Sequence, residues 1–353
     1  MSRRIQLGTV AIGGGAPVVI QSMCNTRTTD APATLAQIAR LAEMGCQVIR
    51  VALPAPAAVE GLREICAASP LPVVADIHFD ARLALAALEA GAAGIRINPG
   101  NIRDAEGVAA VAREAARLGR CVRIGVNMGS LSPTAEARHG RTAEAMVESA
   151  LEYLKVFEAA GCASLKVSLK SSDLAMTVAA CRRFARLSDW PQHIGVTEAG
   201  TPAAGVVKSA IGIGALLLDG IGDTIRVSLT APPEAEITAA LRILDALGLR
   251  PGRPQIISCP TCGRTRFGLI PLAEAVEAEV NRILASGKHI ALKKIAVMGC
   301  EVNGPGEAAD ADVGVAGGNG RGVLFKRGVR VASFPEAELL PRLVAEIHAA
   351  TRG

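Results

Sequence analysis

Three cysteines in the last third of the chain have the types and spacing of metal ligands. Cys259 and Cys262 form a Cys-Pro-Thr-Cys motif, and Cys300 lies in the segment Gly-Cys-Glu-Val-Asn-Gly-Pro-Gly-Glu. No cysteine follows Cys300, so the set is one ligand short of a closed site with four thiolates. Such a site is either completed by another residue type or left open for a substrate. Both outcomes indicate chemistry rather than a purely structural role.

The residue types alone leave three kinds of site open. A redox disulfide within the Cys-Pro-Thr-Cys motif would leave Cys300 without a role. A zinc site usually gains its remaining ligands at short spacing, and Cys300 has no such neighbour. An iron–sulfur cluster held by three thiolates fits the spacing equally well, so zinc and cluster both stay open at this point. Glu307, which follows a Gly-Pro-Gly turn, is the candidate for the missing ligand, and His289 is its rival.

The first 230 residues alternate between short β-rich runs and Ala- and Leu-rich segments with helical spacing. Glycines such as Gly45 and Gly91 close several of these helical segments, as expected of a helix C-terminus. Eight buried strands with intervening helices predict a (β/α)8 TIM barrel over residues 1–248, with a doubly wound open sheet as the alternative. The expected strands are Pro17–Met23, Gln47–Leu53, Pro72–His78, Gly94–Gly100, Val122–Asn127, Ser164–Lys170, His193–Ala199 and Thr224–Thr230.

The pattern changes at the proline- and glycine-rich segment Leu249–Pro254, which predicts a linker. Residues 249–353 are expected to form a smaller α+β domain that contains all three candidate ligand cysteines. Its expected strands and helices are Gln255–Ser258, Lys294–Met298, Asp312–Ala316, a hairpin around Arg327, and helices over Pro271–Ser286 and Pro335–Thr351.

Cations gather at the carboxyl ends of the expected barrel strands, which is where barrel enzymes place their active sites. Residues two or four apart on a strand share a face, so several of these side chains can point inward together. Gathered cations are costly without a counter-ion, and an anionic ligand such as a diphosphate would supply one. The polar residues at these strand ends are Arg50, Asp76, His78, Arg96, Asn98, Arg123, Asn127, Lys166, Ser168, Lys170, Thr197, Glu198, Arg226 and Ser228.

Composition narrows the classes of function. Aromatic residues make up 2% of the 353 residues, which argues against a base-stacking surface for single-stranded nucleic acid. The net charge of +5 comes without a long basic run, which favours a small anion over a polyanion. The N-terminal segment lacks the apolar run of a signal peptide, and no stretch is long enough to span a bilayer. We therefore expect a cytoplasmic protein in which the other six cysteines are buried small hydrophobes.

Ordered motifs along nearly the whole chain resemble the 4-hydroxy-3-methylbut-2-enyl diphosphate synthase family of the methylerythritol phosphate route to isoprenoids. The chain resembles the shorter bacterial form, without the inserted domain of the plant type. Cys24 departs from the threonine of many relatives. The most specific motifs are Val19–Met23, Asp76–Phe79, Arg96–Asn101, Arg123–Asn127, Lys166–Lys170, Gly195–Gly200, Asp223–Ser228, Ser258–Arg264 and Met298–Glu307.

The resemblance implies a TIM barrel followed by a cluster domain of the sulfite-reductase or ferredoxin-like kind. A [4Fe–4S] cluster would be held by Cys259, Cys262, Cys300 and Glu307. The substrate would be 2-C-methyl-D-erythritol 2,4-cyclodiphosphate, reduced by two single electrons from flavodoxin or ferredoxin. Glu198 would lie near the reacting carbon and Asn303 near the cluster. The implied diphosphate-binding residues are Arg50, Arg96, Arg123, Asn127, Lys170, Arg226 and Ser228, with Asp76, His78 and Asn98 as further substrate contacts.

The resemblance also implies a homodimer in which the cluster domain of one chain covers the barrel of its partner. The residues leave two other hypotheses open beside this reductive synthase. One is a zinc-dependent or Schiff-base barrel lyase or aldolase that uses Lys170 or Lys166 as its nucleophile. The other is a non-catalytic iron–sulfur sensor, which would have no need for inward cations at a barrel mouth. Neither hypothesis predicts a binding site for nucleic acid or membrane.

Overall fold

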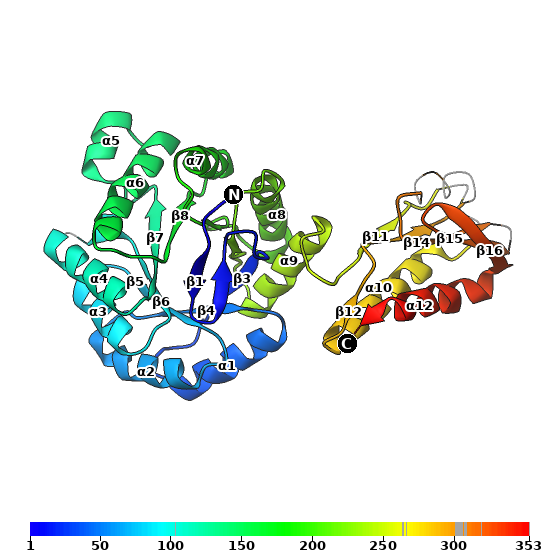
Figure 1. The fold of residues 1–353 in the computed structure, drawn as a ribbon, viewed down its shortest axis with the longest axis horizontal. Coiled ribbons are helices and arrows are strands. Elements are labelled where there is room, and N and C mark those ends of the chain that lie inside the picture. The colour runs from blue at the N-terminus through cyan, green and yellow to red at the C-terminus, as the bar shows by residue number, and fades with distance from the viewer. Residues whose placement is uncertain are drawn as a thin grey trace. The chain divides into compact units, whose positions relative to one another are not determined.

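The computed structural model describes residues 1–102, 104–262, 265, 267–300, 306, 309–318 and 320–352. Two residues of the expected site, Asn303 and Glu307, lie outside these described residues. The chain divides into two compact units, Met1–Ile243 and Leu244–Gly353, each drawn with its own sheet and helices in Figure 1. None of the helices in the described ranges is long and apolar enough to cross a membrane.

The first unit is a parallel eight-stranded barrel, which confirms the predicted fold. Neighbouring strands follow the order β8-β7-β6-β5-β4-β3-β10-β9. The barrel closes between its end strands through a parallel bridge from Val167 to Gln192, where the Val167 N–H donates to the Pro191 carbonyl at 2.9 Å. The barrel strands are β3 (Val19–Met23), β4 (Val48–Ala52), β5 (Val73–Ile77), β6 (Gly94–Ile97), β7 (Cys121–Asn127), β8 (Leu165–Lys170), β9 (His193–Ile194) and β10 (Thr224–Ile225).

Helices surround these strands, as Figure 1 shows. Several begin at the polar N-caps that the sequence offers. The Asp173 carboxylate, for example, accepts from the Met176 N–H at 2.9 Å. Gly45 and Gly91 follow α1 and α3 with φ angles of 105° and 95°, which a residue with a Cβ rarely adopts. The helices of this region are α1 (Ala31–Glu43), α2 (Val59–Ala68), α3 (Ala81–Glu89), α4 (Ala105–Arg117), α5 (Pro133–His139), α6 (Ala143–Ala159), α7 (Leu174–Leu187), α8 (Pro202–Leu218) and α9 (Pro233–Ala246), with short 3₁₀ turns at Pro56–Ala58 and Pro99–Asn101.

Two strands are much shorter than the sequence pattern predicts. We expected strands to run to Ala199 and Thr230, but β9 ends at Ile194 and β10 at Ile225. The backbone leaves strand geometry at Gly195 and Glu198, whose φ angles are 157° and 53°. The positive φ of a glutamate is a strained conformation that tends to occur at functional sites. The polar residues after β9 and β10 therefore lie on loops at the barrel mouth rather than on regular strands.

An N-terminal hairpin that the sequence analysis missed covers the opposite end of the barrel. Strands β1 (Ile5–Leu7) and β2 (Val10–Ile12) pair antiparallel, and Leu7 and Ile12 are fully buried. A Cβ on Gly8 in the turn would lie within 3.3 Å of Pro72 and Ala93, which precede β5 and β6. The hairpin therefore lies at the amino ends of the strands and leaves the carboxyl ends as the accessible mouth.

The second unit contains a mixed five-stranded sheet with the order β11-β13-β14-β15-β16. Strands β11, β13 and β14 are parallel, and β15 and β16 add antiparallel. Helices α10 and α12 pack against one face through Val280 and Leu343, both fully buried (Figure 1). The bounds are β11 (Gln255–Ser258), α10 (Leu269–Ala285), β12 (His289–Ile290), β13 (Lys294–Met298), β14 (Val313–Gly318), β15 (Arg321–Lys326), β16 (Val329–Pro335), a 3₁₀ turn (Glu336–Glu338), α12 (Leu339–Ala349) and β17 (Thr351–Arg352), which pairs with β12.

Candidate active site

The barrel strands bring the predicted cations together at the mouth. Arg96 on β6 lies directly opposite Arg123 on β7, and Arg123 lies opposite Lys166 on β8. Residues in register on parallel strands point to the same face, so these side chains share the barrel interior. Arg123 and Lys166 are 2% and 1% exposed, which is rare for charged residues that have no partner.

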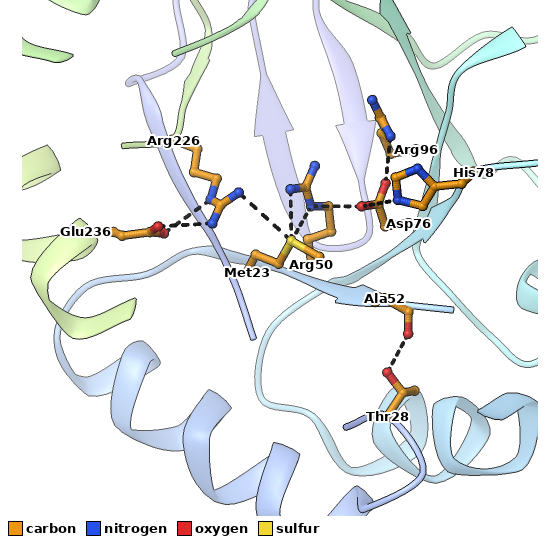
Figure 2. Close-up of polar contacts among 9 residues, drawn as sticks. All are labelled: Met23, Thr28, Arg50, Ala52, Asp76, His78, Arg96, Arg226 and Glu236. Carbon is orange, nitrogen blue, oxygen red and sulfur yellow. Dashed lines mark hydrogen bonds and ion pairs between the residues drawn. The ribbon is translucent and has the colours of Figure 1, made fainter. Parts of the chain in front are cut away.

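Asp76 is the central carboxylate of this group, as Figure 2 shows. Its carboxylate oxygens lie 3.2 Å from Arg96 Nη1, 3.8 Å from Arg50 Nε and 3.4 Å from His78 Nε2. Burial alone would raise the pKa of the Asp76 carboxyl, but the charge of Arg50 and the contact with His78 outweigh it, and Arg96 and Arg123 lower it further. The pKa is therefore held well below its usual range, and Asp76 is ionised at neutral pH.

We expect Asp76→Asn to lower the free energy of unfolding by about 3 kcal/mol, because it leaves Arg50 and Arg96 buried without their carboxylate. A carboxylate with a depressed pKa stabilises the fold above its unfolded-state pKa of about 4, and this stabilisation is lost as the pH falls. The difference between wild type and variant should therefore be full at pH 7 and shrink below about pH 4.

Urea unfolding followed by circular dichroism at a series of pH values measures this difference. Asp80→Asn is the matched control. Asp80 pairs with Arg82 at the surface and caps α3, and asparagine keeps the cap. Equal unfolding free energies for wild type and Asp76→Asn at pH 7 would contradict a structural role for this carboxylate.

Arg226 has a carboxylate partner that the sequence analysis missed. Glu236, in the first turn of α9, accepts from Arg226 Nη2 at 3.0 Å and from Arg226 Nε at 3.2 Å (Figure 2). It also accepts from the Ser22 hydroxyl at 3.1 Å. The Met23 sulfur lies 2.9 Å from Arg50 Nη2 and 3.9 Å from Arg226 Nη1, so it lies between the two guanidinium groups. Sequence spacing gave no signal for Glu236, because an acidic residue in the first turn of a helix is usually a solvated one.

Other cations at the mouth have no carboxylate of their own among the described residues. The Nε and Nη1 atoms of Arg123 and the Nζ of Lys166 are buried without a hydrogen-bond partner. Burial lowers the pKa values of Arg123 and Lys170 well below their usual values, and neighbouring guanidinium groups lower them further. An anion at the mouth would raise the pKa values of Arg123 and Lys170 again, since it supplies the missing counter-charge.

Two glycines leave room for these side chains. A Cβ on Gly125 would lie 2.9 Å from Arg96 Nε and 3.3 Å from the Ser168 hydroxyl. A Cβ on Gly195 would lie 2.3 Å from the Arg226 carbonyl and 2.9 Å from Lys170 Nζ. A substituted residue at either position would displace a cation from the mouth.

The other residues predicted to contact the substrate also lie at the barrel mouth, and their side chains differ in exposure. Asn98 is buried and its Oδ1 has no hydrogen-bond partner in the described parts of the chain, which fits a group that faces a ligand. His78 is about half exposed, Asn127 and Ser228 are partly buried, and Glu198 is exposed. The structure therefore places the predicted substrate residues at the mouth.

The structure brings two of the candidate ligand cysteines close together in the second unit. Cys259 follows β11 and Cys300 follows β13, and these strands are parallel neighbours in which Ser258 lies opposite Val297. The Gly299 N–H donates to Cys259 Sγ at 3.0 Å, so the backbone beside Cys300 contacts the Cys259 sulfur directly. The described residues do not by themselves form a group of three metal ligands, and Glu307 lies outside them. Cys262 is exposed, with its N–H donating to the Thr265 hydroxyl at 3.1 Å, and His289 lies on β12.

The other six cysteines differ in character. Cys24, Cys46, Cys121, Cys162 and Cys181 are buried, and Cys66 is partly buried. Burial raises the pKa of the Cys24 thiol to about 12 and that of Cys162 to about 11. Thiols with such pKa values are unreactive at neutral pH, as expected of packing residues.

Comparisons with known proteins cover both units. The profile described as the GcpE TIM-barrel domain matches residues 2–241, and the GcpE protein C-terminal domain matches residues 255–349. The 4-hydroxy-3-methylbut-2-en-1-yl diphosphate synthase (flavodoxin) of Geobacter sulfurreducens is 52% identical, over 98% of this chain and 97% of that protein. The enzyme of the same name from Salinispora arenicola is 50% identical, over 98% and 87%.

Among solved structures, the dihydropteroate synthase of Thermus thermophilus is similar with a TM-score of 0.50 and 20% identity. The match covers 69% of this chain and 99% of that one. At this level of identity the similarity concerns the fold alone.

Proposed function

This chain belongs to the GcpE family, and from that membership we propose how its two units carry out the reductive opening of a cyclic diphosphate. It is an enzyme of the non-mevalonate route to isoprenoids, with the activity of a 4-hydroxy-3-methylbut-2-en-1-yl diphosphate synthase. The substrate is 2-C-methyl-D-erythritol 2,4-cyclodiphosphate, and the product is (E)-4-hydroxy-3-methylbut-2-enyl diphosphate. The comparisons do not support the alternative, a zinc-dependent or Schiff-base lyase.

The observation that carries the proposed binding mode is the excess of cations at the barrel mouth. Arg123 is deeply buried, and neither Arg123 nor Lys170 has a carboxylate of its own among the described residues, whereas Asp76 and Glu236 are already paired. A cyclic diphosphate would be bound through its phosphate oxygens by these free donors. The diphosphate is also the internal leaving group when the ring opens, so the same cations would stabilise the charge that develops on it. The proposed contacts are Arg50, His78, Arg96, Asn98, Arg123, Asn127, Lys170, Arg226 and Ser228, with Asp76 orienting Arg50 and Arg96.

Glu198 is proposed to act at the reacting carbon, from the loop that follows β9. Its positive φ is a strained backbone conformation of the kind that tends to occur at functional sites. Asn303 is proposed to lie near the cluster, on the basis of its motif alone.

We propose that Cys259, Cys262, Cys300 and Glu307 hold a [4Fe–4S] cluster. The proximity of Cys259 to Cys300 and the N–H donated to Cys259 Sγ support this ligand set. A bound cluster would supply two electrons to the substrate one at a time. The names of the relatives specify flavodoxin, which supports flavodoxin as the donor, with ferredoxin as the other candidate.

The proposed assembly is a homodimer in which the cluster domain of one chain covers the barrel of its partner. It is supported by the family membership and by the division of the chain into two compact units. A purely monomeric species in sedimentation velocity experiments on active enzyme would contradict this assembly.

Anaerobic turnover tests the proposed function directly. Purified, reconstituted protein should contain about four irons per chain and convert the cyclodiphosphate to the linear diphosphate when reduced flavodoxin is supplied. Protein that binds one zinc instead, and does not consume the cyclodiphosphate, would overturn the proposal.

A further inference from the structure

Lys166 is a buried cation that the proposed substrate contacts do not include. It lies on β8 with Ser168 and Lys170 on the same face, whereas Val167 and Leu169 point to the surrounding helices. Lys166 is 1% exposed, and its Nζ has no hydrogen-bond partner among the described residues. It precedes Lys170 by four residues, so it lies deeper in the barrel, below the mouth.

No carboxylate among the described residues forms an ion pair or hydrogen bond with Lys166, although the charge of Asp223 raises its pKa. The neighbouring strand β7 presents Arg123 and Cys121, and Arg50 on β4 also acts on it. His193 on β9 bonds the Thr224 hydroxyl through Nδ1 at 2.8 Å, and burial lowers its pKa well below the usual value, so it is neutral.

The carboxylates near this part of the barrel are already engaged. Asp76 and Glu236, the two carboxylates that are buried in the described parts of the chain, pair with Arg50, Arg96 and Arg226. Asp223 accepts from the Ser2 hydroxyl and from the Gln192 N–H. In the absence of an anion, a charged Lys166 therefore faces Arg123 with no carboxylate of the described residues bonded to it, in a medium of low dielectric constant.

We propose that Lys166 takes up a proton when a diphosphate binds at the barrel mouth, and that its positive charge then compensates negative charge that develops during the reaction. The proposal rests on the proposed function for the identity of the anion. Burial lowers the pKa of Lys166 to about 8, with Cys121 and Asp223 raising it and Arg123 and Arg50 lowering it. A dianion above Arg123 would offset the repulsion and raise this pKa, because it favours the charged ammonium.

Ring opening adds negative charge to the bound diphosphate, which an additional buried cation can compensate. The cyclic substrate is a dianion, and the linear product is a trianion because the released end becomes the terminal phosphate of a diphosphate, which has one more ionisable oxygen. The step consumes two electrons and one proton, breaks a C–O bond of the ring, and releases one water. Lys166 does not supply that proton; it holds its own proton through turnover and compensates the added charge. It is therefore a positioning residue, not a catalytic one.

Isothermal titration calorimetry at pH 8 in buffers of different protonation enthalpy measures the protons taken up on binding. The anaerobic holoenzyme is titrated with the cyclodiphosphate and, separately, with trimetaphosphate, a cyclic anion that has no group titrating near pH 8. Wild type should take up protons with both ligands. Lys166→Met should take up fewer protons per chain than wild type, because part of Lys166 is unprotonated at a pH near its pKa.

Lys166→Arg provides a second variant that stays charged. It should bind both anions and show the same reduced uptake, since arginine has no proton to gain. Lys155→Met, which changes an exposed lysine on α6, is the matched control and should match wild type. Proton uptake in Lys166→Met equal to that of wild type would overturn the proposal. Lys166-dependent uptake with trimetaphosphate, without binding of the cyclodiphosphate, would instead contradict the proposed substrate while supporting the role of Lys166.

Discussion

Replacing Cys300 with serine is expected to remove the cluster and to reduce turnover of the cyclodiphosphate by at least about a thousand-fold. A serine hydroxyl is a poor replacement for a thiolate ligand of iron, and the chain offers no further cysteine beside Cys300. Binding of the cyclodiphosphate should be much less affected, since the cations that bind it lie in the other unit. Iron and sulfide content, and the electron paramagnetic resonance spectrum of the reduced protein, measure the loss of the cluster.

Cys66→Ser is the matched control for this prediction. Cys66 is a partly buried residue of α2, and burial raises its thiol pKa to about 11, so it is not expected to bind metal. This variant should retain the iron content and the turnover of wild type. If Cys300→Ser kept both about four irons per chain and full turnover, Cys300 would not be a ligand and the proposed site would be wrong.

Much of the fold could be predicted because its signals are local. Buried parallel strands are continuous aliphatic runs. The bounds of β4, β5, β7 and β8 therefore differ from the predicted ones by at most one residue at each end. Strands β11 and β13 have the predicted bounds. The strands β9 and β10 were predicted too long because polar residues after them keep a strand-like alternation. A strand ends where its backbone no longer has hydrogen-bond partners on the neighbouring strands, and the alternation of polar and apolar residues does not reveal that point.

The same distinction applies to the site. The inward cations could be predicted because side-chain direction along a strand has a fixed period of two. Their partners could not be predicted, because pairing depends on distances between elements far apart in sequence. Glu236 reaches Ser22 across 214 residues of sequence, and the N-terminal hairpin covers strands that follow it by more than sixty residues. The predicted roles of Asn303 and Glu307 remain predictions, because both lie outside the described residues.

Lys166 illustrates what the structure adds to the sequence pattern. The spacing places Lys166 and Lys170 on one face of β8, but it does not say which of them reaches the mouth. Burial, the missing partner and the closeness of Arg123 separate the two lysines into one that is deep and one that is near the substrate contacts. This difference in depth is what makes a charge-compensating role more suitable for Lys166 than direct binding.

Arg123→Met is expected to weaken binding of the cyclodiphosphate about a hundred-fold or more while raising the stability of the fold. The variant removes an arginine that donates to a phosphate, and loss of such a charged donor costs about 3 kcal/mol of binding free energy. In the free protein, however, Arg123 is 2% exposed, and its Nε and Nη1 have no hydrogen-bond partner within the ranges that the structure describes. Methionine has a similar length and no charge to desolvate, so the free energy of unfolding should rise by about 1 kcal/mol or more.

The opposite signs of these two effects separate a binding role for Arg123 from a structural one. Titration with the cyclodiphosphate measures the affinity, and urea unfolding of the ligand-free protein measures the stability. Arg186→Met, which changes an exposed arginine of α7, should alter neither quantity. If Arg123→Met lost stability as well as affinity, Arg123 would have a structural partner in the fold, and the argument from its missing counter-ion would fail. If Arg123 serves to bind the ligand, its loss should give a more stable protein that no longer binds the substrate. Burying the charge of Arg123 destabilises the free protein, and only the bound anion offsets this effect.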